Sequence, residues 1–343
     1  MDPHVVIGLN AVIMAVTEGS PRILTVRRAE HSLAGELRHR TDIFQSAPPD
    51  AIPFGPFDPG SDRTLELGLR RWVREQTGLD LGYVEQLYTF GDRNRDPSEG
   101  AGGPRVISAA YLALVREGKL SGTAGADWRD WYLFFPWEDW RAGKPGVIEK
   151  HIAPELDLWT RAAPNRRVDE ERRERADINF GLGGAPWVPE RVLERYELLY
   201  EIELAVEALR DRDKKSVAGK PAQALPSWAH QMGHAMALDH RRMLATALGR
   251  LRGKLKYRPV VFELLPSTFT LLQLQRVVEA LAGVHLHKQN LRRLVETGGL
   301  VEGTGQFDQR TGGRPAELFR FRRNVLRERP APGVGIPGIR HAG

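Results

Sequence analysis

Apolar and polar residues alternate with two different periods along this chain, and they predict an α/β region followed by a helical one. Short apolar runs flanked by turn residues predict strands over residues 5–14, 22–28, 87–90, 106–115 and 131–135. Residues 65–76 show the 3.6-residue period of an amphipathic helix, which Gly78 is suited to end. A closing helix is predicted over residues 151–162. Strands, a helix, further strands and a helix in this order are typical of an α/β/α sandwich.

The segments around these elements carry weaker patterns. Residues 45–62 are rich in proline and glycine and are expected to form a loop, while residues 164–177 are mostly charged and are expected to be a solvated connector. Residues 189–209 have a long apolar stripe opposite a glutamate-rich face, which predicts one amphipathic helix. A polar linker is expected over residues 210–226. The tail, residues 330–343, is rich in proline and glycine and is predicted to be disordered.

The last third of the chain predicts three helices and a hairpin. Apolar stripes place the helices over residues 243–255, 270–282 and 288–297, each ending near a glycine or a basic residue. Residues 300–301 and 318–321 are predicted to pair as a hairpin with an arginine- and glycine-rich tip. This order is that of a winged helix-turn-helix. A small helical bundle with a charged surface is the alternative.

Charge is segregated along the chain. The overall formal charge is +6, but residues 239–329 contain 18 Lys and Arg against 8 Asp and Glu, whereas residues 1–238 contain 31 against 36. A basic region joined to a mildly acidic one indicates a polyanion-binding module attached to something else. A solvated basic face would give the same charge count.

Polar residues in the predicted winged helix suit contacts with DNA. Gln, Asn and Arg on an exposed short helix can reach base edges in the major groove, and hydroxyls at a helix N-terminus can receive a phosphate. A basic glycine-rich wing tip can enter a minor groove. The predicted DNA-binding residues are Arg250, Lys254, Lys256, Thr268, Thr270, Lys288, Gln289, Asn290, Arg292, Arg293 and Arg314. A winged helix that binds another protein is the competing interpretation.

Residues 71–79 read Arg-Trp-Val-Arg-Glu-Gln-Thr-Gly-Leu and resemble the core of a Nudix box, Arg-Glu-U-x-Glu-Glu-x-Gly-U, where U is apolar. Two of its three glutamates are replaced, by Trp72 and Gln76, and only Glu75 remains. Nudix hydrolysis needs Mg²⁺, which takes hard oxygen ligands from a carboxylate cluster. We therefore predict no catalytic residues, no metal site and no required cofactor.

The same domain still offers groups that can bind a nucleotide, because arginine can clamp phosphate without a metal. The predicted ligand-binding residues are Arg27, Arg70, Trp72, Arg74, Glu75, Gln76 and Arg105. Two alternatives stay open at this point. Arg70 and Arg74 could simply form a solvated face paired with Glu66, and Trp72 could stack on an adenine or fill the former metal site.

Both halves together resemble the Nudix-related transcriptional regulators of NAD metabolism. The resemblance is carried by residues 57–78, 85–97, 106–111, 247–259, 262–266, 269–271 and 313–316. The acidic segment 164–236 resembles the longer, NadQ-like repressors of this group. The resemblance implies a homodimeric repressor of NAD biosynthesis or salvage genes that binds a double-stranded DNA operator. It also implies an adenine-nucleotide effector, either ADP-ribose, NAD or ATP.

The predicted fold class is thus α/β plus α, in four parts. These are a degenerate Nudix-like sensing domain (1–163), a helical insert (164–237), a winged helix domain (238–329) and the tail (330–343). An active Nudix pyrophosphohydrolase with a nucleic-acid-binding tether is the alternative function, and an interaction scaffold that binds no DNA is a third. The absence of cysteine, of a basic leader and of an apolar run of about 18 residues predicts a cytoplasmic protein with no membrane partner.

Overall fold

A mixed sheet forms the centre of the N-terminal half. The computed structural model describes residues 5–27, 50–93, 95, 96, 99, 102–122, 125–215, 226–309 and 315–334. The strands are β1 (Val5–Thr17), β2 (Ser20–Arg27), β3 (Asp50–Ala51), β4 (Phe54–Pro56), β5 (Tyr83–Phe90), β6 (Arg105–Leu114) and β7 (Asp127–Asp130). Their order is β3-β2-β1-β6-β5, with β4 paired to β1 and β7 to β2. Only β1 and β6 run parallel, so most of the sheet is antiparallel.

Helix α1 (Leu65–Thr77) covers one face of this sheet, as the apolar stripe of residues 65–76 predicts. Its Leu69 and Val73 are buried against Leu9 and the next inward residues of β1. Thr64 caps the first turn, and Gly78 ends the helix in the left-handed conformation that the sequence predicted. The opposite face packs on α7 (His240–Leu255), which also contacts α5 (Val192–Glu201). Helices thus cover both faces of the sheet, but the second is α7 and not the closing helix predicted over residues 151–162, which packs on α4 (Arg166–Phe180).

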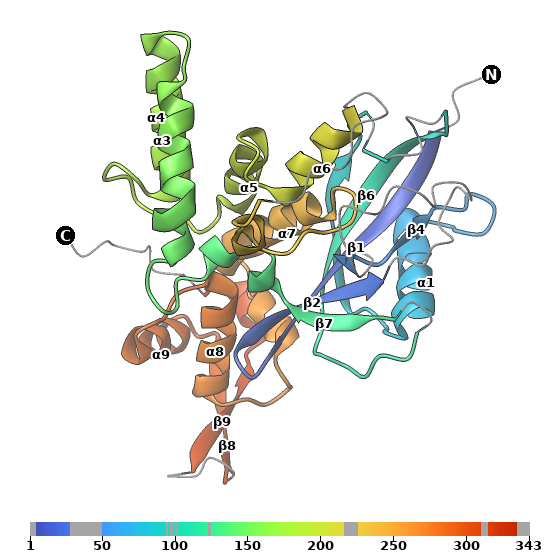
Figure 1. Ribbon diagram of the computed structural model, residues 1–343. Helices are drawn as coiled ribbons and strands as arrows, with labels where there is room; N and C mark the ends of the chain where they lie inside the picture. The colour runs from blue at the N-terminus through green and yellow to red at the C-terminus, as the bar shows by residue number, and fades with distance from the viewer. Residues whose placement is uncertain are drawn as a thin grey trace.

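The middle of the chain is more helical than its composition suggested. Besides α5 it contains η1 (Trp131–Leu133), η2 (Pro136–Glu138), η3 (Ile148–Ile152), α3 (Ala153–Arg161), α4 (Arg166–Phe180), α6 (Val206–Lys215) and η4 (Ala229–Met232). Helices α3 and α4 lie side by side and project from the body as a hairpin (Figure 1). The described segments hold no helix with the length and apolar character needed to cross a membrane.

Four predictions for this middle region are wrong. Residues 131–135 are a 3₁₀ turn rather than a strand. Residues 164–177 form most of α4, where i,i+4 ion pairs such as Arg166–Glu170 support a highly charged helix. The single helix predicted over residues 189–209 is divided into α5 and α6, with Glu203 in a positive-φ conformation between them. The loop predicted over residues 45–62 contains the short strands β3 and β4.

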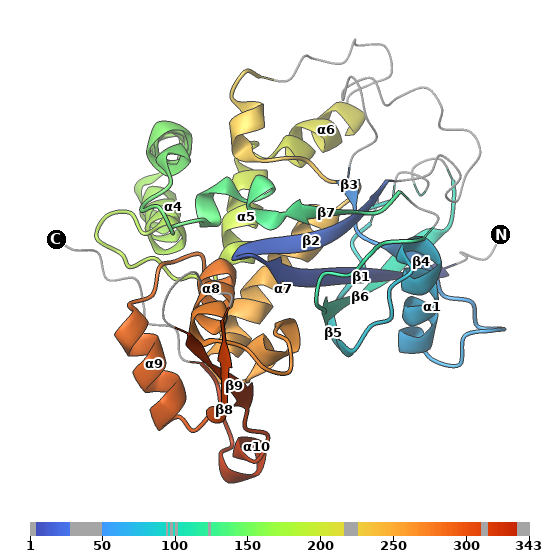
Figure 2. The ribbon, with the colours of Figure 1, turned by 90° about the horizontal axis from the view of Figure 1, so that it is seen from below.

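The winged helix follows α7 and lies at the far end of the molecule from α1 (Figures 1 and 2). It consists of η5 (Val260–Leu264), α8 (Leu271–Ala282), α9 (Lys288–Thr297), β8 (Val301–Asp308), β9 (Ala316–Phe321) and α10 (Val325–Glu328). Backbone hydrogen bonds in both directions join Phe269 to Phe319, which fastens the hairpin beside the start of α8. The helices predicted over residues 270–282 and 288–297 and the hairpin are therefore present here, while the helix predicted over residues 243–255 is α7 and packs on the sheet and α5.

The parts of the chain share one interior. A single apolar cluster includes Met14 of β1, Tyr196 of α5, Leu248 of α7 and Leu281 of α8. The beginning of the predicted disordered tail also belongs to it, because Val334 is fully buried and Gly333 packs against the backbone of Lys256. The prediction of disorder is thus wrong for residues 330–334, and residues 335–343 lie outside the described part of the chain.

Candidate ligand-sensing domain and nucleic-acid interface

The two substituted positions of the degenerate Nudix box are both bonded to strand β4. The indole of Trp72 donates to the carbonyl oxygen of Pro56 (2.8 Å), and its ring lies so close to Gly55 that a Cβ there would fall 2.2 Å from it. The side-chain amide of Gln76 donates to the carbonyl oxygen of Phe54 (2.6 Å) and accepts from its N–H (3.2 Å). The side chains of Trp72 and Gln76 are thus part of the contact between α1 and β4.

The carboxylates near the box are engaged by arginine. Arg71 donates two hydrogen bonds to Asp62 (3.0 and 2.9 Å), and it also lies 3.5 Å from Glu75. The hydrogen bonds from Arg71 hold the pKa of Asp62 below its ordinary value, and the backbone N–H of Asp58 acts in the same direction. The same guanidinium lies over the Trp72 ring at 4.7 Å. Asp62 and Glu75 are thus both paired with Arg71.

The other predicted ligand-binding arginines are distributed over separate elements. Arg70 pairs with Glu66 (2.9 Å) and donates to the backbone of residues 81–82. Arg74 pairs with Asp80 (2.8 Å), and both side chains are exposed. Arg105, at the start of β6, donates to the carbonyl oxygen of Gly91 (2.7 Å), while Arg27 lies exposed at the end of β2. Trp72, Glu75 and Gln76 all lie on α1, whereas Arg27 lies on β2 and Arg105 on β6.

Helix α9 presents the residues predicted to contact DNA. Leu291 and Val295 bury one face of this helix, and His287 precedes it without a side-chain cap. The exposed side chains are Lys288, Gln289, Asn290, Arg292 and Arg293. Of these, Arg292 pairs with Glu296 (2.8 Å) on the same helix. The second helix of a helix-turn-helix therefore has a surface of donors and positive charge.

The remaining predicted DNA contacts have varied surroundings. Arg250 is exposed on α7. Lys254 is partly buried and bonded to Glu85 and to the hydroxyl of Tyr83 (3.1 Å) in strand β5, and Lys256 pairs with Glu190. The hydroxyl of Thr270 accepts from the N–H of Gln273 in a capping box, while Thr268 is half-buried just before it. Arg314 lies outside the described residues.

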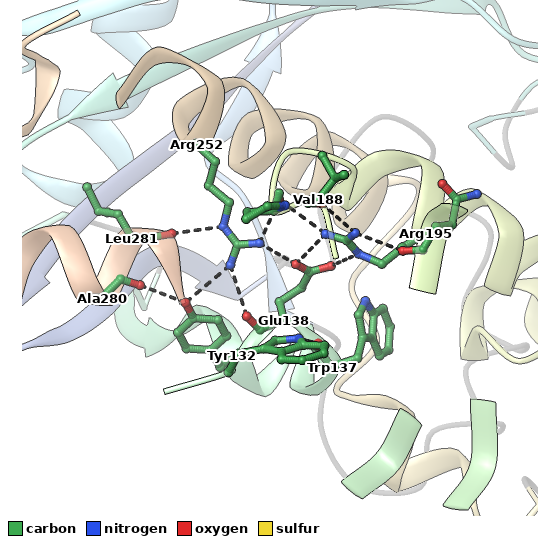
Figure 3. A network of polar contacts seen from close by, with 11 residues as sticks. Tyr132, Trp137, Glu138, Val188, Arg195, Arg252, Ala280 and Leu281 are labelled. Atoms are coloured by element: carbon green, nitrogen blue, oxygen red, sulfur yellow. Dashed lines mark hydrogen bonds and ion pairs between the residues drawn. The ribbon is translucent and has the colours of Figure 1, made fainter. Parts of the chain in front are cut away.

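A buried charge cluster joins the two halves, and the sequence analysis missed it. Glu138 of η2 accepts from Arg195 of α5 (2.6 and 2.9 Å) and from Arg252 of α7, and all three side chains are 0 or 1 % exposed (Figure 3). Arg252 is not part of the apolar stripe predicted over residues 243–255, yet its side chain is buried. The surrounding aromatic residues Trp131, Tyr132, Trp137 and Trp140 are buried as well. The only local signal was the position of Arg252 among apolar neighbours of α7.

The winged helix has a recognisable family. Residues 261–321 match the profile described as the NrtR DNA-binding winged helix domain. This part of the chain is therefore similar to the winged helix of NrtR. The match covers η5, α8, α9 and the β8–β9 hairpin, so it includes the exposed surface of α9. It confirms the winged helix-turn-helix predicted from the order of helices and hairpin.

A curated relative agrees with this assignment. The chain is 40% identical over 86 residues to the ADPR responsive transcriptional repressor NtrR of Acinetobacter baylyi. The matched residues are 25% of this chain and 34% of the relative, so the chain spans about a third of the length of that protein in the comparison. Sequence similarity is thus concentrated in one part of the molecule.

Two solved structures extend the likeness to the whole fold. The structure of Shewanella oneidensis NrtR with a 27mer DNA superimposes with a TM-score of 0.52 at 19% identity, covering 94% of this chain and 95% of that one. The structure of the same protein without DNA gives a TM-score of 0.51 at 19% identity, covering 93% and 95%. The chain therefore shares the overall fold of that structure, and its winged helix is the part that the family profile also matches.

Proposed function

We propose that this chain is a DNA-binding transcriptional repressor of NAD biosynthesis or salvage genes. The observation that carries this proposal is the exposed face of α9, with Gln289, Asn290 and Arg293, in a region that matches the NrtR winged helix. Amide and guanidinium groups on a recognition helix pair with adenine and guanine edges in the major groove. The wing and α8 would then hold the DNA backbone.

The Nudix-like domain, in this proposal, binds a nucleotide and does not hydrolyse it. Trp72 and Gln76 make hydrogen bonds to β4 where the box pattern has glutamates, and Glu75 faces Arg71. An indole cannot ligate Mg²⁺, and an amide is a weaker ligand than a carboxylate. The proposed ligand contacts remain those predicted from the sequence, with the exposed Arg27, Arg74 and Arg105 as phosphate partners.

ADP-ribose is the first effector to test, because the Acinetobacter relative is described as ADPR responsive. NAD and ATP share the adenine and phosphate chemistry and are the alternatives. We further propose a homodimer, since the twofold symmetry of a dimer matches a palindromic operator. The boundaries at residues 163, 237 and 329 remain predictions, as does the likeness of the insert to NadQ-like repressors.

Fluorescence anisotropy with the full chain tests the function. The DNA is the region upstream of NAD-synthesis genes in the source genome, and a shuffled sequence is the control. Salt is held constant because phosphate contacts make affinity strongly salt-dependent. Sequence-specific binding that one of ADP-ribose, NAD or ATP shifts by about 5- to 150-fold supports the proposal.

Equal binding to both DNAs would overturn the operator-binding function and favour an interaction scaffold. A parallel assay follows release of phosphate-containing products from ADP-ribose with Mg²⁺. Turnover that Glu75→Gln abolishes would overturn the non-catalytic role and establish the pyrophosphohydrolase instead. Sedimentation at several concentrations tests the dimer independently of both.

A further inference from the structure

The Glu138 cluster contacts the end of helix α8, which directly precedes the proposed recognition helix. Tyr132 of η1 donates its hydroxyl to the carbonyl oxygen of Ala280 (2.8 Å), and Arg252 donates Nε to that of Leu281 (3.0 Å). The backbone N–H of Trp140 donates to Gly283 (2.7 Å). The last carbonyls of a helix have no partner within it. Here two of them, and the carbonyl oxygen of the C-cap residue Gly283, are bonded to residues outside the matched winged helix, and Figure 3 shows the contacts of Ala280 and Leu281.

Glu138 fixes the groups that make these contacts. Its carboxylate and its carbonyl oxygen both accept from Arg252, the latter at 3.2 Å, while Arg195 binds the carboxylate from the other side. The five N–H donors of each guanidinium are all used, since Arg195 also donates to backbone carbonyls of residues 179, 188 and 189. A guanidinium with every donor bonded has one orientation, so Arg252 is held rigidly.

Glycine is required where α8 meets this cluster. Gly283 ends the helix with φ +72°, a conformation that L side chains rarely adopt. A Cβ there would lie 2.4 Å from the carbonyl oxygen of Glu138 and 2.8 Å from the Tyr132 hydroxyl. The end of α8 is therefore seated directly on Glu138 and Tyr132, with no space between them.

The position of α8 is passed on to α9 through the turn between them. Glu279 accepts from the N–H of Leu286 (2.8 Å), and Gln275 donates to the carbonyl oxygen of Leu286 (3.0 Å). On the other side, Tyr132 follows β7 directly, and Asp130 of β7 caps the turn that contains it (2.8 Å). Hydrogen bonds, joined by short stretches of the chain, thus connect the end of β7 to α8 and to the turn before α9.

We propose that Glu138 and Tyr132 are positioning residues for DNA reading, which set the orientation of α8 and α9 relative to the sensing domain. This inference rests on the proposed function. In it, the buried cluster is the contact that transmits a conformational change in the sheet of the sensing domain to the winged helix. Neither residue touches DNA in this proposal, and both act through α8.

The test uses Tyr132→Phe, because Glu138→Gln removes a buried charge and risks unfolding. Tyr200→Phe is the control, since the hydroxyl of Tyr200 makes a hydrogen bond to Asp211 (2.9 Å) on α6 and lies on α5 away from α8, whereas the buried hydroxyl of Tyr132 also accepts from Arg252. Hydrogen exchange of the full chain without DNA is measured first. A lost hydrogen bond should speed local opening, so exchange in residues 277–283 is expected to rise about three- to tenfold in Tyr132→Phe only.

Operator affinity is the second readout. Tyr132→Phe should weaken binding to operator DNA, or reduce its shift by the nucleotide, by about threefold or more. The dependence of affinity on salt should stay the same, because the phosphate contacts themselves are intact. A merely structural tyrosine would raise exchange throughout the chain and leave the nucleotide response unchanged.

These measurements distinguish a positioning role of Tyr132 from a merely structural one. Exchange in residues 277–283 that equals the wild type, or that rises equally in Tyr200→Phe, overturns the inference. A uniform rise over all segments does so too. If the wild type binds no operator specifically, the proposed function fails, and the exchange data still show whether Tyr132 holds α8.

Discussion

The indole nitrogen of Trp72 donates a hydrogen bond of 2.8 Å to the carbonyl oxygen of Pro56. The side chain at a position where the box pattern has glutamate is thereby turned onto the adjacent strand β4. Gly55 leaves just enough room for the ring, because any Cβ there would overlap it. Trp72 is therefore part of the packing between α1 and β4.

Trp72→Ala should therefore lower stability more than an exposed residue of the same helix does. The substitution removes one hydrogen bond and a half-buried ring, and we expect a loss of about 2–4 kcal/mol in urea unfolding. Leu67→Ala is the control, since Leu67 is 51% exposed on α1 and should cost little. Equal losses for the two variants would mean that the indole does not hold α1 to β4.

Asp62 should make stability fall at acid pH. Its folded-state pKa is lowered, first by the hydrogen bonds from Arg71 and then by the N–H of Asp58. The contribution is complete above the unfolded pKa of about 3.9 and is lost as pH falls through the lower folded value. In Asp62→Asn, the urea concentration at the midpoint of unfolding should depend less steeply on pH in this acid range. An unchanged slope in the variant would show that other carboxylates carry the effect.

Glu138→Gln should destabilise the protein strongly. The amide would leave the buried Arg195 and Arg252 without an anionic partner, and removing one member of a buried ion pair costs about 3–5 kcal/mol. Glu170→Gln removes the same charge from an exposed pair with Arg166 on α4, and should cost at most about 0.5 kcal/mol. Unfolding in urea compares the two. Similar values would argue against the coupling of three segments through Glu138.

Arg293→Ala should weaken operator binding and relax specificity at one base-pair position. Its side chain is exposed on α9, and loss of a guanidinium contact to a base costs about 1–3 kcal/mol. Arg167→Ala, on the projecting hairpin, is the control, because that arginine is equally exposed but pairs with Glu171. Anisotropy against single-base operator variants gives the answer. Unchanged affinity and specificity would remove Arg293 from the reading surface.

Gly283→Ala should displace the end of α8. The positive φ alone costs about 1–2 kcal/mol, and the added methyl meets the carbonyl oxygen of Glu138. Gly143→Ala separates the two effects, because Gly143 has φ +95° but no atom within 4 Å of the added carbon. Thermal unfolding should therefore show a larger loss at residue 283 than at residue 143. A loss of thermal stability at residue 283 no greater than that at residue 143 would show that α8 can shift to accommodate the methyl group.

Local sequence determined most of the secondary structure around the candidate sites. The stripe of α1 with its stop at Gly78, and the capped α8 between Thr270 and Gly283, were predicted because periodicity and caps act within a few residues. The substitutions in the segment that resembles a Nudix box and the basic character of α9 could also be predicted, because both are local sequence patterns. Where local patterns are ambiguous the prediction failed, as for the apolar run of residues 131–135, which is a turn.

Tertiary structure alone decided what the charged and aromatic side chains do. Arg252 is not part of the apolar stripe of α7, and it is buried because Glu138, 114 positions earlier in the chain, lies opposite. Lys254 is a predicted DNA contact, and only the structure shows that it pairs with Glu85 of β5. Only the structure shows that Trp72 packs on β4. Such pairings depend on contacts between residues distant in the chain, and no pattern of neighbouring residues encodes them.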